Sequence, residues 1–191
     1  MSSSLLGNIM TPSPRITWIK ARKTTADTHE MPSMRKLFAK YRDKLPDSAL
    51  LVDPFARNCD WCFPYTNDIN PDTLAADHLD AEEYLEKLMI MGKRFDLGIL
   101  DPPFSDRQSG ELYGTPNLYA SDSAKMTRIS YALGNLVKPG GYIIKCGYNT
   151  NPFHSSYELK EIRIVHHGGT ANDTLFSVWQ NMNGDLRTWT E

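Results

Sequence analysis

The chain of 191 residues has only three cysteines, no long apolar run and no excess of charge of either sign. Three cysteines argue against a disulfide framework and cannot complete a four-thiolate zinc site. Cys59 and Cys62 have the spacing of a redox or metal motif, but no second pair accompanies them, so we interpret them as ordinary cysteines of a reducing compartment. His166 and His167 stand beside glycines that a turn needs, and we assign no metal to them.

The lack of a long apolar run also bears on location. No window approaches the ~20 apolar residues that a membrane-spanning helix needs, and the N-terminus lacks the charged-then-apolar pattern of a secretion signal. We therefore expect a soluble cytoplasmic protein with no membrane partner. The 21 Lys and Arg residues nearly balance the 23 Asp and Glu residues, so the net charge of -2 neither favours nor excludes a nucleic-acid partner.

The length of the chain limits the number of domains. A chain of 191 residues, of which 40% are hydrophobic, can bury one sizeable core but not comfortably two. Residues 1–14 contain serine and proline without periodicity. We expect an N-terminal arm or tail over residues 1–27 and a single domain over residues 28–191.

Short apolar runs alternate with helical patterns along the rest of the chain. Residues 49–53 and 95–101 end at Asp53 and Asp101, and such runs are typical of buried parallel strands. The alternation predicts a doubly wound, mostly parallel α/β sheet with a C-terminal antiparallel hairpin, and Asp53 and Asp101 would share its ligand-binding edge. The other expected elements are helices over residues 32–45, 82–88 and 122–137, and strands near residue 65 and over residues 141–146, 161–165 and 174–179.

The segment Asp101-Pro102-Pro103-Phe104 completes and follows the second of these runs. The lone pair of an exocyclic amine is delocalised into its ring, so a site that methylates this amine must favour a pyramidal nitrogen. The Asp101 carboxylate and the Pro102 carbonyl can both accept hydrogen bonds from one amino group, and Phe104 can stack on the ring. A rigid turn after a strand is the alternative interpretation of this segment.

An ordered set of further segments accompanies this motif: Asp53-Pro54-Phe55-Ala56, Thr66 to Pro71, Asp80 to Leu85, Lys138 to Gly141, and the late segments at residues 147–151 and 167–174. With these segments the chain resembles the class I S-adenosylmethionine-dependent methyltransferases, specifically the adenine-N6 DNA methyltransferases and most closely their small phage-type members. The resemblance covers about residues 28–180. It implies a Rossmann-like methyltransferase fold and S-adenosylmethionine as the cofactor.

The resemblance also implies roles for particular residues. Carboxylates accept the hydrogen bonds that ribose hydroxyls and an adenine amino group donate. Each aspartate taken alone is equally well explained as a turn residue or a helix cap, most of all Asp80, because a helical pattern follows it. The implied catalytic residues are Asp101, Pro102, Pro103 and Phe104. The implied cofactor-binding residues are Asp53, Phe55 and Ala56 on the methionine side, Asp68 and Ile69 at the ribose, and Asp80 and Ala81 at the adenine.

The chain departs from the family pattern after Asp53. The first cofactor motif usually continues with glycines, but here no glycine occurs before Gly92. About eleven residues separate Asp53 from the strand expected near Tyr65, which is barely enough for a crossover that contains a helix. The helical layer on that face should therefore be thin, and a protein partner, a second copy or the N-terminal arm could cover it. Trp18, Trp61 and Phe63 are candidates for such contacts, or are ordinary core residues.

No separate target-recognition domain fits into the remaining length. Specificity would come from the loop over residues 105–120, where Arg107 and Gln108 could touch phosphate or base edges, from the arm, or from another chain. Lys20, Arg22 and Lys23 form a basic cluster that either contacts phosphate or is a solvated surface.

We expect methyl transfer from S-adenosylmethionine to adenine N6 in DNA, either at a flipped base or in a single strand, because this atom is unreachable within a duplex. An RNA guanine-N2 methyltransferase is one alternative. A non-catalytic partner subunit with the same fold is the other.

Overall fold

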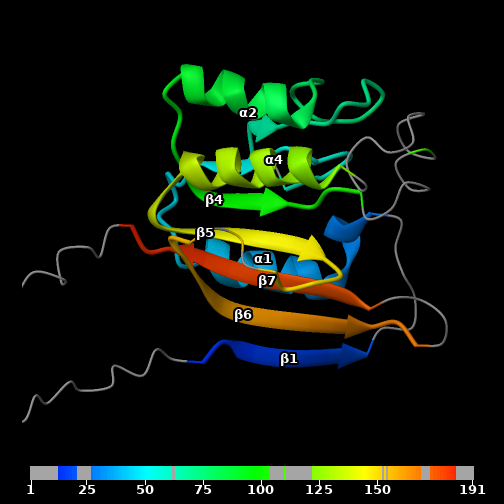
Figure 1. Cartoon of the computed structure of the whole chain (residues 1–191). Helices are drawn as coiled ribbons and strands as arrows, with labels where there is room; N and C mark the ends of the chain where they lie inside the picture. Colours follow the sequence, from blue (N-terminus) through cyan, green and yellow to red (C-terminus); the bar gives the residue numbers. More distant parts are fainter. Residues whose placement is uncertain are drawn as a thin grey trace, which may run out of the picture.

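In the computed structural model the chain forms a mixed α/β sheet with helices on both faces (Figure 1). The structure describes residues 13–20, 27–61, 63–103, 110, 122–151, 153, 155–168 and 173–183. The strands within these residues are β1 (Arg15–Lys20), β2 (Leu51–Asp53), β3 (Tyr65–Thr66), β4 (Phe95–Leu100), β5 (Val137–Gly147), β6 (Tyr157–His166) and β7 (Thr174–Asn181). The helices are the 3-10 turn η1 (Thr28–Glu30), α1 (Pro32–Arg42), α2 (Ala81–Ile90) and α4 (Ser123–Leu136).

The seven strands form one sheet in the order β1-β6-β7-β5-β4-β2-β3. Strand β7 runs antiparallel to both of its neighbours, and all other neighbouring strands are parallel. The mostly parallel sheet and the C-terminal antiparallel pair predicted from the sequence are therefore confirmed. Strand β5 begins at Val137, earlier than the strand expected over residues 141–146, so the segment Lys138 to Gly141 lies inside it. Pairing with β4 is interrupted between Val137 and Tyr142.

The strand order reverses next to β4. From β2 the chain goes on to β3 on one side, whereas from β4 it goes on to β5 on the other side. In open α/β sheets, ligands bind outside the carboxyl ends of the strands at such a reversal. The candidate site therefore lies where β2 and β4 end.

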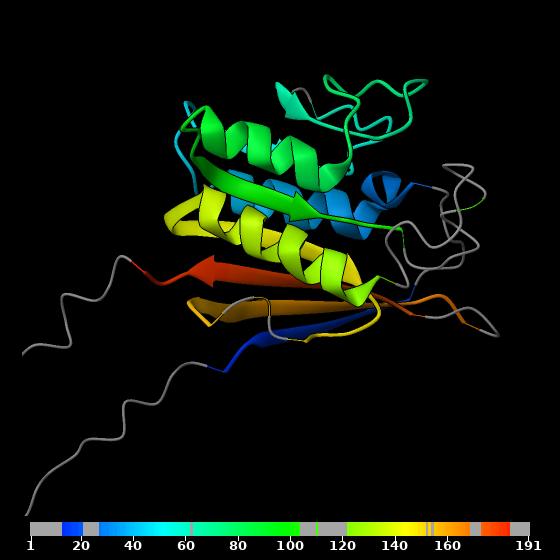
Figure 2. The ribbon, with the colours of Figure 1, turned by 45° about the horizontal axis from the view of Figure 1, so that its top comes forward.

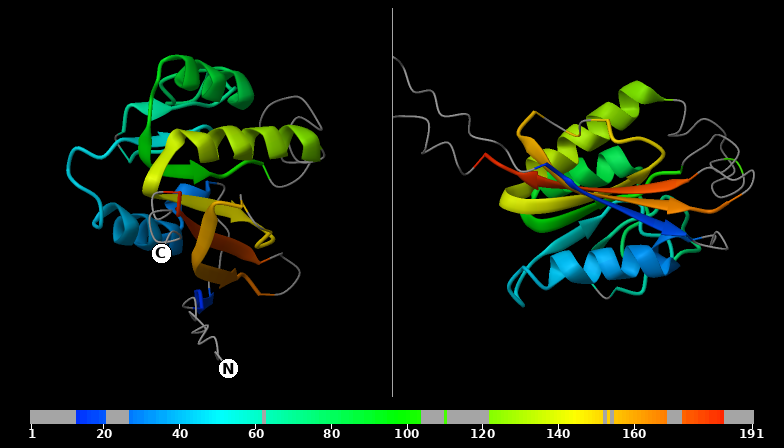
Figure 3. Two further views of the ribbon diagram at one scale, coloured as in Figure 1. Left: turned by 60° about the vertical axis from the view of Figure 1, so that its left-hand side comes forward. Right: turned by 90° about the horizontal axis from the view of Figure 1, so that it is seen from below.

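Two hydrophobic clusters hold the layers together. Helices α2 and α4 lie side by side on one face, as Figure 2 shows, and α1 covers the other face (Figure 3). On the α2/α4 face the buried residues include Val52, Tyr84, Leu85, Leu133 and Ile143. On the α1 face they include Met34, Leu37, Leu97, Ile144 and Phe176. The neighbouring residues Ile143 and Ile144 of β5 thus face opposite layers, as alternation along a strand requires.

The connection from β2 to β3 is as thin as its length predicts. Its described residues form no helix. Trp61 stacks on Phe38 of α1 with ring centroids 4.0 Å apart, and Phe63 packs against the same ring from 6.4 Å. Trp61 and Phe63 therefore pack against the hydrophobic cluster on the α1 face of the sheet.

Residues 15–20 lie within the segment expected as an N-terminal arm or tail. They form strand β1 at the edge of the sheet, parallel to β6. Ile16 and Trp18 are 57% and 68% exposed, so these two apolar side chains of the strand do not enter the core. None of the helices in the described part of the chain has the length and apolarity that crossing a bilayer requires.

Candidate functional site

Asp53 and Asp101 lie at the carboxyl ends of two neighbouring strands. Asp53 is the last residue of β2, and Asp101 directly follows β4. The two strands are parallel, with Leu51 opposite Leu97 and Val52 opposite Gly98. The structure thus brings both carboxylates to the edge predicted from the sequence, at the reversal of strand order.

The Asp53 carboxyl is buried and holds the turn that follows it. Its Oδ1 accepts a hydrogen bond of 2.9 Å from the backbone N–H of Phe55. Burial raises the pKa of Asp53 to about 8, although the bond from Phe55 opposes this, and the charges of Asp101 and Asp68 raise it further. In the chain without a ligand, the protonated form of the Asp53 carboxyl is therefore favoured at pH 7.

The Asp101 carboxyl has a similar environment. Burial raises its pKa to about 7, and hydrogen bonds from the side chains of Thr28 and Cys146 oppose the rise. Of the other residues in the motif, Pro102 is partly buried and Pro103 is buried. Phe104, expected to stack on the substrate ring, lies outside the described residues.

Asp68 has a carboxylate oxygen that could receive a ligand. Its Oδ1 accepts from the backbone N–H of Asn70 at 2.9 Å. Its Oδ2 is buried and has no hydrogen-bond partner among the residues that the structure describes. Burial raises the pKa of this carboxyl, while backbone bonds from Asn70 and Arg57 oppose the rise. A buried acceptor without a partner costs about 1–3 kcal/mol, so a hydroxyl donor at this point would be stabilising. Ribose hydroxyls fit this requirement.

Asp80 acts as a helix cap in this structure. Its Oδ1 accepts from the backbone N–H of Glu82 at 3.0 Å, at the start of α2, and its Oδ2 accepts from Lys125 Nζ at 2.6 Å. Both oxygens are engaged within the chain, which agrees with the capping interpretation. An adenine amino group would have to share this carboxylate with Lys125. Ala81 follows in the α2/α4 core and is buried.

The remaining predicted cofactor residues differ in exposure. Phe55 is buried in the α2/α4 core, and Ala56 is buried beside it with its N–H bonded to the carbonyl of Asn67 at 2.8 Å. Ile69 is partly buried. Phe55 and Ala56 therefore lie in the turn that follows Asp53, where the methionine side of a cofactor was expected.

Asn67 is a buried residue of the site that the sequence analysis did not single out. Its amide nitrogen donates to the carbonyls of Pro54 and Leu79 at 3.2 and 3.0 Å. Its oxygen accepts from the backbone N–H of Leu79 at 2.9 Å. This side chain joins the turns after β2 and β3 to the segment before α2. Its position between the second expected strand and Asp68 was the available signal.

Arg57 occupies the turn where the sequence lacks the expected glycine. Its φ of 47° lies in the left-handed region, which favours glycine. Its guanidinium forms an ion pair with Asp27, and the positive charge helps to lower the pKa values of Asp68 and Asp101. The missing glycine is visible in the sequence, but no local pattern marks Arg57 as a residue of the site.

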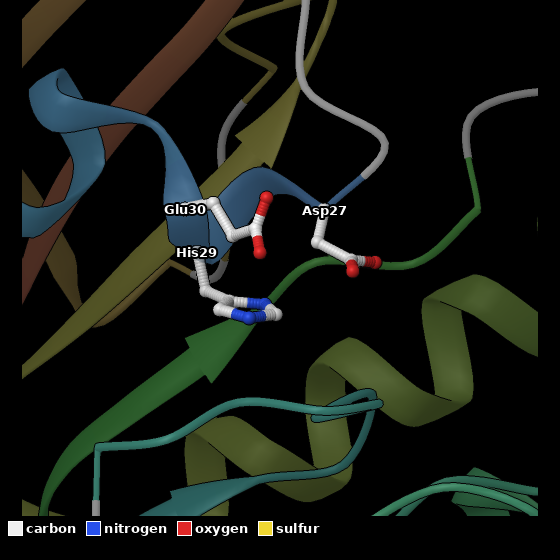
Figure 4. Close-up of side chains that lie close together, drawn as sticks. All are labelled: Asp27, His29 and Glu30. Carbon is white, nitrogen blue, oxygen red and sulfur yellow. The ribbon is translucent and has the colours of Figure 1, made fainter.

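Residues 27–30 bring a further group of polar side chains to the end of β4 (Figure 4). Potential ligand atoms of Asp27, His29 and Glu30 lie within 4.8 Å of one another. Asp27 is already paired with the guanidinium of Arg57, which would repel a metal ion, so we assign no metal to this group. Burial lowers the pKa of His29, which favours its neutral form at pH 7.

No protein-family model and no curated protein sequence matches the chain. Solved structures do match it. An S-adenosylmethionine-dependent methyltransferase from Agrobacterium tumefaciens superimposes with a TM-score of 0.53 and 11% identity, over 76% of this chain and 60% of that one. The chain has the fold of such methyltransferases.

Two further methyltransferase-fold structures lead to the same conclusion about the fold. TrmN from Thermus thermophilus gives a TM-score of 0.51 at 13% identity, over 81% of this chain and 50% of that one. NSun6 from Pyrococcus horikoshii gives 0.50 at 10% identity, over 73% and 50% of the two chains. The chain thus spans between half and three fifths of the length of the three structures. At these identities the likeness establishes the fold, and the reaction must be argued from the site.

Proposed function

We propose that this chain transfers a methyl group from S-adenosylmethionine to an exocyclic amine, with adenine N6 in DNA as the substrate. The observation that carries the proposal is the position of Asp101-Pro102-Pro103. This segment begins at the carboxyl end of β4, beside Asp53 and at the reversal of strand order, in a chain with a methyltransferase fold.

The side chains on this edge fit the cofactor. S-adenosylmethionine supplies an electrophilic methyl group on a positively charged sulfonium. Asp68 would hold its ribose hydroxyls through the buried Oδ2, and the turn from Asp53 to Ala56 would hold its methionine part. The carboxyls of Asp53 and Asp101 place potential negative charge at the same edge, which favours a cationic ligand.

Asp101 and the carbonyl of Pro102 would orient the substrate. Both are acceptors, and an exocyclic amine has two N–H donors. Acceptors aimed at both N–H groups turn the nitrogen lone pair toward the methyl group. The amine nitrogen gains a methyl group and loses one proton. A carboxylate with a pKa of about 7 can take that proton and release it to water.

The substrate assignment rests on the ordered motifs of the sequence. DNA is the proposed partner, either with a flipped adenine or as a single strand. Transfer of an isotope-labelled methyl group to single-stranded and duplex DNA and to RNA tests this assignment. We expect label in adenine-containing DNA. Label confined to RNA would contradict the DNA assignment and favour a guanine-N2 methyltransferase.

Calorimetry tests the cofactor assignment separately. We expect Asp68→Asn to weaken S-adenosylmethionine binding about tenfold, because an amide nitrogen cannot accept from a ribose hydroxyl. Asp72→Asn, an exposed change in the same loop, is the matched control and should bind like the wild type. Failure of the wild-type chain to bind the cofactor at millimolar concentration would contradict both enzyme assignments and favour a non-catalytic subunit.

A further inference from the structure

The segment from Asp27 to Glu30 contacts the candidate site at two points. The side chain of Thr28 donates a hydrogen bond to the Asp101 carboxylate. Asp27, its neighbour in the chain, forms an ion pair with Arg57, with side chains 16% and 24% exposed. Figure 4 shows that this segment lies beside the end of β4. Through these two contacts the segment links the turn after β2 to the Asp101 carboxylate after β4.

The backbone conformation of Arg57 is one that glycine adopts at lower cost, which points to a role for the arginine side chain. A φ of 47° is unfavourable for any residue with a Cβ and costs glycine nothing. The strained position stands directly beside the candidate site, where such outliers are often part of function. The backbone N–H of Arg57 bonds to Asp68, and glycine would supply the same N–H. The contribution that glycine could not make at this position is the guanidinium group.

We propose that Arg57 is a positioning residue, which holds Asp27 and thereby keeps the Thr28 hydroxyl on the Asp101 carboxylate. A carboxylate offers about four lone-pair directions, and Thr28 and Cys146 take two of them. Their bonds would help to fix the plane in which the carboxylate meets a substrate amine. This inference rests on the proposed function, because it assigns to Asp101 a substrate to orient.

Arginine suits this position better than lysine. Its planar guanidinium can engage a carboxylate through two parallel hydrogen bonds, whereas an ammonium acts as a point charge on a flexible stem. We therefore expect Arg57→Lys to restore part of what Arg57→Gly loses. Arg57→Gly should also fold well, because glycine adopts a φ of 47° without strain.

The groups that face Asp101 determine the direction of the effect. They come from the 27–30 segment, from the turn after β2 and from β5: Asp27, Thr28, Asp53, Arg57 and Cys146. The charge of Arg57 and the bond from Thr28 favour the ionised form of Asp101, and the charge of Asp27 opposes it. Removal of Arg57 therefore raises the pKa of Asp101 in three ways. It removes the positive charge, takes one cationic partner from Asp27 and loosens Thr28.

The test is the titration of the Asp101 carboxyl by carbon NMR in the wild type, Arg57→Gly, Thr28→Val and the double variant. We expect the midpoint to rise in both single variants, with the double variant shifted by less than their sum, because both act through the Thr28 bond. Arg35→Ala breaks another Arg–Asp pair, with Asp60, and should leave the midpoint unchanged. An unchanged midpoint in Arg57→Gly, or strictly additive shifts, would overturn the proposal.

Kinetics provide the second readout once transfer is detected. We expect kcat to fall about tenfold in Arg57→Gly and to recover partly in Arg57→Lys, with the rising limb of the pH profile moved to higher pH. A change confined to KM, with kcat and the pH profile as in the wild type, would contradict a positioning role. Because the titration needs no substrate, a wild type without activity would count against the proposed function and leave the test of Arg57 intact.

Discussion

The charge of the Asp101 carboxylate raises the pKa of Asp53, its neighbour across the ends of β2 and β4. Burial is the larger cause at both residues and raises the pKa of Asp53 to about 8 and that of Asp101 to about 7. Both carboxyls therefore bind their protons more tightly than ordinary aspartates, although the charge of Arg57 opposes this at Asp101. A sulfonium bound beside them would lower both pKa values, because an opposite charge favours the ionised form.

This relationship predicts that the affinity for S-adenosylmethionine rises with pH between about pH 6 and about pH 9, because deprotonation of the two carboxyls becomes less costly. S-adenosylhomocysteine is neutral at sulfur and should lack most of this dependence. Calorimetry in buffers of different ionisation enthalpy measures both the affinity and the protons released. Equal pH dependence for the two ligands would show that the carboxyls do not respond to the sulfonium charge.

The buried carboxyl of Asp53 should also make the stability of the chain depend on pH. Between its ordinary value of 3.8 and the folded value of about 8, the folded chain keeps a proton that the unfolded chain releases. Stability therefore falls as pH rises through this window, by at most about 1.4 kcal/mol per pH unit. Asparagine does not ionise and can still accept from the N–H of Phe55.

We accordingly expect Asp53→Asn to raise the melting temperature more at pH 8 than at pH 5, as measured by calorimetry. Asp47→Asn, at an exposed position, is the control and should change little at either pH. If Asp53→Asn had the same effect at both values, the raised pKa would be wrong.

Gly141 in β5 should not tolerate a side chain. A Cβ there would lie 2.8 Å from Val137 Cγ1 and 2.9 Å from the backbone oxygens of Asp96 and Lys138. Backbone oxygens cannot move cheaply, so we expect Gly141→Ala to lower the free energy of unfolding by about 1–3 kcal/mol. At Gly147, a Cβ meets nothing within 4 Å, and Gly147→Ala should stay within about 0.5 kcal/mol. Urea denaturation of the two variants decides this, and equal stability would contradict the close packing at Gly141.

Glu161 of β6 should be a major electrostatic contact between α1 and the sheet. It is 1% exposed, and it accepts from Tyr41 Oη at 3.1 Å and from Arg163 Nε at 2.9 Å, with Lys40 as a further partner. Burial opposes its ionisation, but the hydrogen bonds from Lys40 and Arg163 lower its pKa overall. The stabilisation is therefore present above the ordinary pKa of 4.5 and is lost as pH falls through the lower folded value.

Removal of this carboxylate leaves two cations without their partner. We expect Glu161→Ala to cost about 3 kcal/mol at pH 7, and the loss to shrink in acid. Glu161→Gln keeps an acceptor and should lose less. Chemical denaturation at two pH values measures this, and a Glu161→Ala penalty that does not depend on pH would count against the ionic contribution.

Strand positions near the site could be predicted because their signal is local. The runs that end at Asp53 and Asp101 are mostly apolar, as buried strands are, with Asp96 as the one charged residue inside them. Because β2 and β4 are parallel, their carboxyl ends bring both aspartates to one edge of the sheet, and the reversal of strand order lies between them. Asp80 was ambiguous in the sequence, because a carboxylate before a helix serves equally as a cap.

The features that were missed depend on partners far away in the chain. Strand β1 pairs with β6, whose residues lie more than a hundred positions later, and its Ile16 and Trp18 stay exposed instead of entering the core. Arg57 has a left-handed backbone conformation that no local sequence pattern indicates. Its partner Asp27 lies 30 positions earlier in the chain. Asn67 likewise acts through backbone groups of separate turns.

The most direct test of the proposed reaction is the analysis of nucleosides from DNA incubated with the chain and S-adenosylmethionine that carries a deuterated methyl group. Mass spectrometry should find deuterated N6-methyladenine with the wild type and none with Asp101→Ala, which should still bind the cofactor because Asp68 and the turn after β2 are unchanged. Asp47→Ala should act like the wild type. Deuterated N6-methyladenine at wild-type yield with Asp101→Ala, or none with a wild type that binds the cofactor, would contradict the account.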